Sequence, residues 1–417
     1  VVVKGYAQIP GIDYTNTHSP VAQDNSIKVT LAIAMMREGW TVEMIDIEAA
    51  FLEAELDEDI YIEWPPGAIE FGYFSETEAD GTCLKLEKAM YGCVQSPRMF
   101  FDTYSRHLES MGLTQSLADP CIWYKHDANQ NLILLVAVYV DDCIIAGTKE
   151  EVESFKIGVK KRFNITDLGP IKKHLGVWYE HHKDESGQEY FRMTMEGYKN
   201  DILGDWKKIT GKDPKPAKTP GFPGESLSKN QGDEVDKENY RKLLGRLMWF
   251  VRKLMPEALN TIRELAMYMD NPGEEHWRAM GRLVGYIAGQ DEIELRLMKP
   301  RDFKVYAYVD SNYATNKETR KSVTGYYITI GGCLVAAASK TQPSVTLSST
   351  EAEYIAASMC ATEIQFIQML LEELMPTADT RPATLFEDNT GAIFLIENQA
   401  VGIGPNTSIF VGITYVH

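Results

Sequence analysis

The chain has 417 residues, of which 44% are hydrophobic, and this is enough for two or three domains with ordinary cores. Its six cysteines form no Cys-x-x-Cys pair, which excludes a zinc knuckle and a disulfide framework, and no apolar run approaches the length of a membrane span. The formal net charge of −18 argues against a generally basic nucleic-acid-binding protein. The lysine-rich stretch 156–218 nevertheless fits either a local basic groove or a solvated face.

The start of the chain lacks a signal-peptide pattern and begins with Val1 rather than Met. We therefore expect a soluble intracellular protein that has no membrane partner. We also expect it to be a fragment of a longer open reading frame.

The first predicted elements are a helix and a strand. Apolar residues recur at helical spacing over residues 27–37, and Gly39 follows as a stop. From Trp40 onwards apolar and polar residues alternate, which predicts a strand that delivers Asp46 at its end.

A continuous apolar run at 133–147 carries two adjacent aspartates, Asp141 and Asp142, at its middle. Burial of unpaired carboxylates is costly, but at the turn of a hairpin they can hold Mg²⁺ and leave positions open for water and phosphate. An ordinary Asp-containing turn explains this stretch equally well when it is taken alone. Together with Asp46, two chain-distant strands deliver the carboxylates that two-metal phosphoryl transfer requires.

Helices and one linker are predicted around and after this hairpin. Helical patterns cover 98–111 and 150–163, and a Pro- and Gly-rich stretch at 211–239 is the best linker candidate. Three further helical patterns follow it, at 240–255, 257–269 and 274–288.

Three more carboxylates lie at the ends of predicted elements nearer the C-terminus. An alternating strand ends on Asp310, and Gly331-Gly332 predicts a two-residue hairpin turn after it. Glu351 lies in the first turn of a long helix with a Ser or Thr cap, and Asp388 follows the next strand. Each acid alone fits a cap or a strand-end charge, but the order of the elements favours one shared metal-binding locus.

Several segments, in the same order along the chain, resemble the reverse transcriptases of copia-type retrotransposons. They are Val1–Gln8, Gly11–Tyr14, Ser19–Ala22, Met44–Leu52, Ala89–Phe100, Tyr139-Val140-Asp141-Asp142, Leu168-Gly169-Pro170, His174–Val177 and Glu274–Trp277. The resemblance implies an α+β fold with a right-hand polymerase, followed by an α/β ribonuclease H-like domain. The implied divisions are fingers and palm at 1–210, a linker at 211–239, a helical thumb or connection at 240–300, the ribonuclease H-like domain at 303–400 and an aberrant tail at 401–417.

For the polymerase, the resemblance implies that Asp46, Asp141 and Asp142 are catalytic and hold two Mg²⁺ or Mn²⁺ ions, bridged by Asp46 and Asp141. It implies that Phe51 excludes a 2′-hydroxyl from the nucleotide sugar, although an ordinary core phenylalanine has the same sequence pattern. It also implies that Lys4 reaches the triphosphate, although a lone lysine is more often a surface charge. The full implied set of substrate-binding residues is Lys4, Phe51, Tyr91, Gly92, Gln95, Tyr139 and Gly176.

For the ribonuclease H-like domain, the resemblance implies that Asp310, Glu351 and Asp388 are catalytic ligands of two further ions. The family carries a fourth acid in a segment that usually reads Arg-Thr-Lys-His-Ile-Asp, whereas this chain has no carboxylate after Glu397. Our hypothesis is a frameshift near Ile403, because the degeneracy of the code permits codons for the residues found here that encode the family segment in a neighbouring frame. We therefore expect weak or lost hydrolysis.

These patterns together predict an RNA-directed DNA polymerase that adds deoxynucleoside triphosphates (dNTPs) to a primer. Its expected partners are an RNA or DNA template, the primer and the RNA–DNA hybrid, which is held mainly by its backbone. The family implies a cytoplasmic location, in a virus-like particle, or a nuclear one. The alternative is a decayed retroelement fragment that folds and binds nucleic acid but catalyses nothing.

Overall fold

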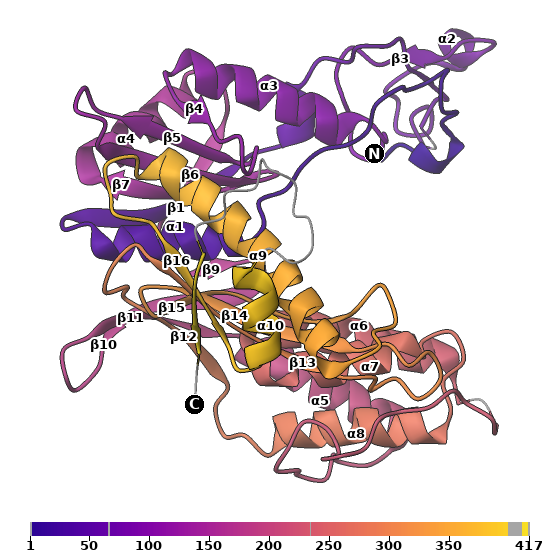
Figure 1. Ribbon diagram of the computed structural model, residues 1–417. Coiled ribbons are helices and arrows are strands. Elements are labelled where there is room, and N and C mark those ends of the chain that lie inside the picture. The colour runs from indigo at the N-terminus through magenta and orange to yellow at the C-terminus, as the bar shows by residue number, and fades with distance from the viewer. Residues whose placement is uncertain (1, 66, 234, 399–410, 416–417) are drawn as a thin grey trace. The chain divides into compact units, whose positions relative to one another are not determined.

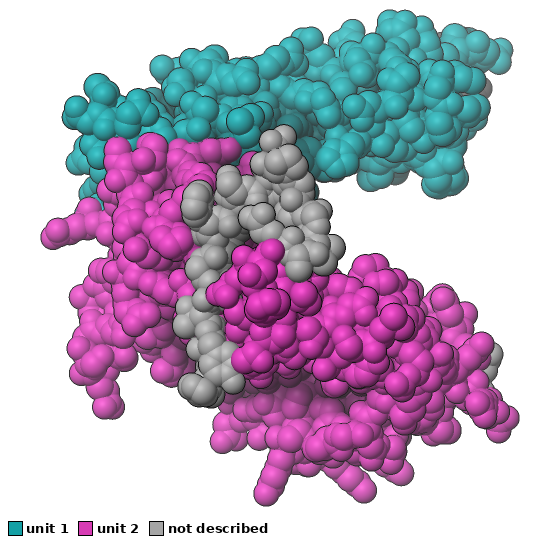
Figure 2. Space-filling view, in the orientation of Figure 1, with its two compact units in different colours: residues 1–30, 39–171 teal, residues 31–38, 172–417 magenta. Residues whose placement is uncertain are grey.

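The computed structural model describes residues 2–65, 67–233, 235–398 and the backbone of 411–415 (Figure 1). It has a mixed α and β architecture, as predicted, and divides into two compact units (Figure 2). Unit 1 comprises residues 1–30 and 39–171, and unit 2 comprises residues 31–38 and 172–417. The domain boundaries expected at 210, 240 and 303 remain predictions.

Unit 1 is built on a six-stranded antiparallel sheet with the order β4-β5-β6-β7-β1-β8. Strands β6 and β7 form the predicted hairpin, and the predicted strand that carries Asp46, β1, pairs directly with β7. The strand bounds are β1 Trp40–Ile47, β4 Thr114–Gln115, β5 Ile122–His126, β6 Leu132–Tyr139, β7 Asp142–Thr148 and β8 Ile165–Pro170.

Two amphipathic helices, α3 (Ser96–Ser110) and α4 (Lys149–Lys160), share one core with this sheet. Proline occupies the first turn of α3, where a missing amide costs nothing. The hydroxyl of Thr148 caps α4 by accepting a hydrogen bond from the amide of Glu151. The core contains Ile45, Ile47, Phe100, Tyr104, Trp123, Val136, Val138, Ile145, Phe155 and Phe163.

The remaining elements of unit 1 are short. They are η1 (Gly5–Ala7), η2 (Ala50–Glu53), α2 (Glu76–Ala79) and a two-stranded sheet of β2 (Tyr61–Ile62) and β3 (Leu84–Lys85). Helix α1 (Asp24–Met36) begins in unit 1, and its residues from 31 onwards belong to unit 2.

Unit 2 contains a four-stranded antiparallel sheet, ordered β12-β11-β10-β9, and a group of helices. The strands are β9 Lys173–His174, β10 Val177–Lys183, β11 Glu189–Thr194 and β12 Glu294–Met298. The helices are α5 Glu196–Thr210, α6 Lys237–Leu254, η3 Pro256–Ala258, α7 Leu259–Met267 and α8 Glu274–Ala288. The three helical patterns predicted after the linker are thereby confirmed.

The predicted linker is a packed segment. No helix or strand lies between α5 and α6 in the residues described there. The amide of Ala217 donates to the carbonyl of Gly285, and Arg282 donates to the carbonyl of Gly221 and the hydroxyl of Thr219. These bonds fix the segment along α8.

A second sheet of unit 2 has five strands in the order β15-β14-β13-β16-β17. β13 (Val305–Asn312), β14 (Val323–Ile330) and β15 (Cys333–Thr341) are antiparallel, whereas β16 (Ala383–Glu387) is parallel to β13. The turn predicted at Gly331-Gly332 joins β14 to β15, with positive φ at both glycines. Of the predicted aberrant tail, residues 401–410 and 416–417 lie outside the described residues, and β17 (Val411–Tyr415) pairs in parallel with β16.

Helix α9 (Ser349–Leu374) packs on β13, β14 and β16, and the short helix α10 (Thr390–Glu397) lies against it. By length and composition, α9 is the one described helix that is long and apolar enough to cross a membrane, contrary to the expectation that no apolar run approaches that length. Its buried residues, among them Ala352, Ala356, Cys360 and Ile364, face the sheet, as in the core helix of a globular domain.

Candidate functional site

Three predicted catalytic aspartates meet at one end of the unit 1 sheet. Asp46 on β1 lies directly opposite Asp142 on β7, and Asp141 occupies the turn that joins β6 to β7. The carbonyl of Asp141 accepts a hydrogen bond from the amide of Ile47 at 3.0 Å, which ties this turn to β1. The other turn residue, Val140, has a φ of 59°, a left-handed conformation that is strained for a β-branched residue.

The electrostatics of this group match crowded carboxylates. Burial, together with the charges of Asp141 and Asp46, raises the pKa of Asp142 to about 6. Burial, followed by the charges of Asp141 and Glu48, raises the pKa of Asp46. The positive charge of a divalent cation would relieve this repulsion. Carboxylate oxygens are the ligands that Mg²⁺ prefers.

Two aromatic rings lie beside the aspartates. The ring centroids of Phe51 and Tyr91 are 4.9 Å apart, and the charges of Asp141 and Asp46 add to burial in raising the pKa of Tyr91. The ring centroids of Phe51 and Phe100 are 6.4 Å apart, so Phe51 borders the core as well as the acidic site. The contact with Phe100 agrees with the interpretation of Phe51 as a core residue, whereas exclusion of a 2′-hydroxyl stays a prediction.

The segment that carries Tyr91 is held by close backbone contacts with the N-terminal residues. The amide of Val3 donates to the carbonyl of Tyr91 at 2.8 Å. A Cβ at Gly92, whose φ is 97°, would overlap the carbonyl oxygen of Val3, and a Cβ at Gly5 would overlap that of Gly92. Glycine is thus required on both sides of this seam, which we define as the contact of residues 3–5 with 91–92.

The other predicted substrate-binding residues have varied environments. Gln95 is buried, where it accepts a hydrogen bond from Gln8 and donates one to the carbonyl of Asp13, so its amide is used within the protein. Lys4 is exposed. Tyr139 is half-buried and lies opposite Asp142 in the pairing of β6 with β7. Gly176 belongs to unit 2, in the tight turn between β9 and β10, with a φ of 83°.

A buried lysine fixes the strand that carries Asp46. Lys156 on α4 is only 3% exposed and forms ion pairs with Glu43 of β1 and with Asp167 of β8, the latter at 2.7 Å. Asp167 also accepts the amide of Gly169, at the irregularity where the register between β1 and β8 shifts. The three charged groups, here called the Lys156 triad, connect α4 with two neighbouring strands.

A second acidic group lies in unit 2. One oxygen from each of Asp310, Glu353 and Asp388 lies within 4.8 Å of the others, and among the described residues this is the one group of metal-ligating side chains that is so compact. Asp310 and Asp388 converge because β13 and β16 run in parallel, with Tyr308 paired to Phe386 just before them. Glu353 reaches the same place from α9.

Burial and nearby negative charges raise the pKa of two members of this trio, Asp310 and Glu353. Burial, followed by the charge of Asp388, raises the pKa of Asp310. Burial also raises the pKa of Glu353 to about 7, and the charges of Asp310 and Asp388 add to this effect.

Glu351, the acid expected from the sequence, lies outside this compact trio. Its amide donates to the hydroxyl of Ser348, and its carboxylate accepts the amide of Leu347 at 2.6 Å. Glu351 therefore caps the start of α9, and Glu353, one position beyond Ala352, provides the third carboxylate. The sequence signal that distinguishes the two acids is the Ser-x-x-Glu spacing of a capping box, which Ser348 and Glu351 share and Glu353 does not.

The sequence interpretation also missed Glu387, which is 1% exposed. One carboxylate oxygen accepts the amide of Asn389, and the other, Oε2, has no hydrogen-bond partner. Burial raises the pKa of Glu387 to about 7. Its charge contributes to the raised pKa values of Glu353 and Cys360 on α9, so Glu387 lies in the layer between that helix and the sheet.

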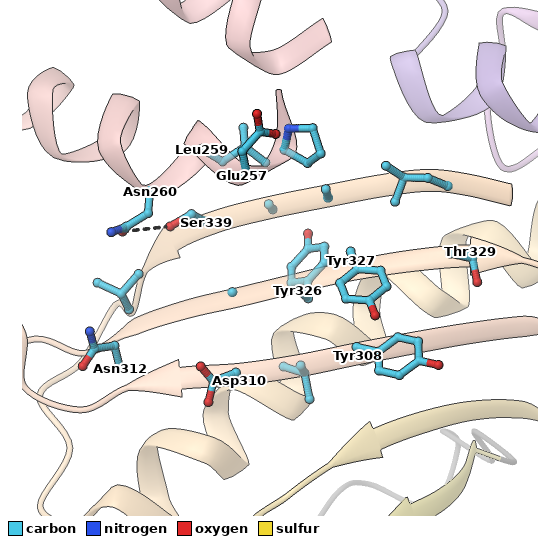
Figure 3. A pocket seen from close by; sticks show the side chains of 17 residues that line it. Glu257, Leu259, Asn260, Tyr308, Asp310, Asn312, Tyr326, Tyr327, Thr329 and Ser339 are labelled. Carbon is cyan, nitrogen blue, oxygen red and sulfur yellow. Dashed lines mark hydrogen bonds between the residues drawn. The ribbon is translucent and has the colours of Figure 1, made fainter. Parts of the chain in front are cut away.

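Asp310 of the trio also lines a groove of about 720 Å³ (Figure 3). Its floor is formed by β13, β14 and β15, and residues 256–260 border it. The rings of Tyr308 and Tyr327 stack with a centroid distance of 4.6 Å. Asp310, on the same strand as Tyr308, lines the groove and is also a member of the trio. An aromatic sheet face and an acidic strand end therefore meet at Asp310.

Comparisons with known proteins identify the family of the chain. Residues 1–220 match the family described as "Reverse transcriptase (RNA-dependent DNA polymerase)". Over 402 residues, or 95% of the chain, it is 32% identical to the retrovirus-related Pol polyprotein from transposon RE1 of Arabidopsis thaliana and 30% identical to that from transposon RE2. It is also 30% identical over 407 residues to the Pol polyprotein from transposon TNT 1-94 of Nicotiana tabacum.

The aligned region spans 26% of the RE1 and RE2 polyproteins and 29% of the TNT 1-94 polyprotein. The match of the reverse transcriptase family covers more than half of the chain and includes Asp46, Asp141 and Asp142. The chain therefore belongs to the reverse transcriptase (RNA-dependent DNA polymerase) family of copia-type retrotransposon Pol polyproteins.

Proposed function

We propose that this chain adds deoxynucleotides to the 3′ end of a primer on an RNA or DNA template. The observation that supports this most directly is the pairing of Asp46 with Asp142 across β1 and β7, with Asp141 in the adjoining turn. These side chains would hold two divalent cations, Mg²⁺ or Mn²⁺, because all their donor atoms are carboxylate oxygens. Bound there, the cations would activate the primer hydroxyl and stabilise the leaving pyrophosphate.

The protein's own groups would position the substrates. Phe51 and Tyr91 form an aromatic wall beside the aspartates, against which the sugar of a dNTP can lie. The seam keeps Tyr91 in place through backbone contacts, and the exposed side chain of Lys4, a residue of that seam, would approach a triphosphate. Gly176 would contact the primer as part of the β9–β10 turn, and Gln95 would act indirectly, by holding the N-terminal segment.

Primer extension on an RNA template tests this proposal. The unmutated chain is expected to extend the primer only when Mg²⁺ or Mn²⁺ is present, and Asp141→Asn is expected to abolish extension. Glu153→Gln, on the exposed side of α4, is the matched control and should extend normally. Absence of metal-dependent extension by the unmutated chain would refute the proposal.

A second activity is proposed for unit 2, namely hydrolysis of the RNA strand of an RNA–DNA hybrid by a ribonuclease H-like domain. It is supported by the compact trio of Asp310, Glu353 and Asp388, whose oxygens fit the same hard divalent cations. Loss of the family's fourth acid to a frameshift remains a prediction, so weak hydrolysis is expected. Cleavage of a labelled hybrid by the unmutated chain but not by Asp388→Asn would support the assignment, and equal cleavage by both would contradict it.

The division into fingers, palm and thumb, and residence in a cytoplasmic virus-like particle or in the nucleus, are likewise part of this proposal. The alternative of a decayed, inactive fragment is not favoured by the comparisons, because relatives align over 95% or more of the chain.

A further inference from the structure

We propose that Glu387 is a fourth carboxylate ligand of the divalent-cation site formed by Asp310, Glu353 and Asp388. This inference rests on the proposed metal binding in unit 2 and assigns a residue that the sequence patterns left without a role. Glu387 precedes Asp388 directly and lies at the end of β16, so it belongs to the same strand end as one ligand of the trio.

The orientation of Glu387 follows from the alternation of β16. Ala383, Leu385 and Glu387 occupy the buried side of this strand, the side that α9 covers. Glu353 is on the buried side of α9, among Ala352, Ala356 and Ala357. The two glutamates therefore enter one layer from opposite sides.

One buried oxygen of Glu387, Oε2, has no hydrogen-bond partner among the described residues. With 1% exposure it is almost completely removed from water, and its Oε2 has no hydrogen-bond partner. Glu353, at 7% exposure, also has an Oε2 without one, and none of the four carboxylates pairs with Lys or Arg in the described part of the chain. A buried carboxylate that has one oxygen without a partner and no counter-ion is costly, and a bound cation reduces that cost.

Charge balance favours four carboxylates over three. Two divalent cations carry four positive charges, as in the two-metal sites that cleave phosphodiesters. The trio alone supplies three negative charges, and ionised Glu387 supplies the fourth. Hard cations such as Mg²⁺ and Mn²⁺ accept oxygen ligands of this kind.

Mn²⁺ binding provides the test. All proteins carry Asp46→Asn and Asp141→Asn, which remove ligands from the unit 1 site, and free Mn²⁺ is counted by electron paramagnetic resonance. We expect Glu387→Gln and Asp388→Asn each to raise the Kd for Mn²⁺ at the unit 2 site by about tenfold or more. Glu363→Gln is the matched control, because Glu363 is on α9 but accepts a hydrogen bond from Tyr326 instead. Its Kd should equal that of the background protein.

Thermal unfolding separates metal binding from folding. In EDTA, Glu387→Gln should melt at or above the temperature of the background protein, because the substitution removes a buried charge without a partner. Added Mn²⁺ should raise the melting temperature of the background protein and of Glu387→Asp, which keeps the charge, but raise that of Glu387→Gln much less.

Two results would overturn the inference. If Asp388→Asn weakens Mn²⁺ binding but Glu387→Gln does not, the trio binds metal and Glu387 is not a ligand. If neither substitution changes binding, the trio is not a metal site, and the inference fails with it. Primer extension by the unmutated chain is independent of both results and decides the polymerase proposal separately.

Discussion

Asp142→Asn should stabilise the metal-free protein while it removes a proposed catalytic carboxylate. The pKa of Asp142 is raised from 3.8 to about 6 by burial and by the charges of Asp141 and Asp46. A pKa difference of this size lowers the free energy of unfolding at neutral pH by about 3 kcal/mol. Partial exposure to solvent reduces this to about 1–2 kcal/mol, or roughly 2–6 °C in melting temperature.

The pH dependence of this effect has a defined sign. Between about pH 4 and pH 6 the native state binds more protons at Asp142 than the unfolded state does, so the stability of the unmutated protein falls as pH rises through this window. Asparagine does not titrate, so the advantage of Asp142→Asn should be absent near pH 4 and complete above about pH 6.

Thermal unfolding in EDTA at pH 4, 6 and 8 measures the effect, with Glu153→Gln as the control for loss of an exposed acid. Saturating Mg²⁺ should reduce or reverse the advantage, since only the unmutated site keeps all three carboxylates. If Asp142→Asn is less stable than the unmutated chain at pH 8 in EDTA, the crowding of carboxylates does not destabilise this site and the argument is wrong.

Three further substitutions test other parts of the structure. Phe51→Val should lower the preference for dNTPs over ribonucleotides by about tenfold or more in primer extension, because the sugar would lose its aromatic neighbour; an unchanged ratio of kcat/KM values would assign Phe51 to the core alone. Lys156→Met should destabilise unit 1 by about 2–4 kcal/mol in urea unfolding, because it leaves Glu43 half-buried without its cation; a change near zero would show that the Lys156 triad adds no net stability. Glu353→Gln should abolish RNA-strand cleavage whereas Glu351→Gln should only cost about 1 kcal/mol of stability as a weakened cap, and the reverse outcome would restore the acid chosen from the sequence.

Much of unit 1 could be predicted from sequence because its signals are local. The apolar run before and after Asp141 and Asp142 is long enough for a hairpin, and the alternation from Trp40 defines β1. Pairing of β1 with β7 is a long-range contact, which no local sequence pattern specifies. The four-stranded sheet of unit 2 also depends on a long-range contact. Its strand β12 pairs with β11, which lies about a hundred residues earlier, and neither strand was predicted.

The acids of unit 2 were harder to assign because two roles compete for similar positions. Glu351 and Glu353 both lie near the start of α9, and only the capping geometry distinguishes them. Glu387 could have been found by alternation, because it shares the buried side of β16 with Ala383 and Leu385. Because fully buried glutamates are rare, a glutamate on the buried side of a predicted strand deserves notice.

The close contact of Gly5 with Gly92 makes the proposed nucleotide-binding region depend on the N-terminal residues of the chain. The backbones of Gly5 and Gly92 are in direct contact. A methyl group on either glycine would therefore separate the same two segments, residues 3–5 and 91–92. The effects of Gly5→Ala and Gly92→Ala should therefore not add: once the first substitution has separated the chains, the second has little left to disturb. Affinity for the incoming nucleotide would then fall through displacement of Tyr91, with every carboxylate still in place.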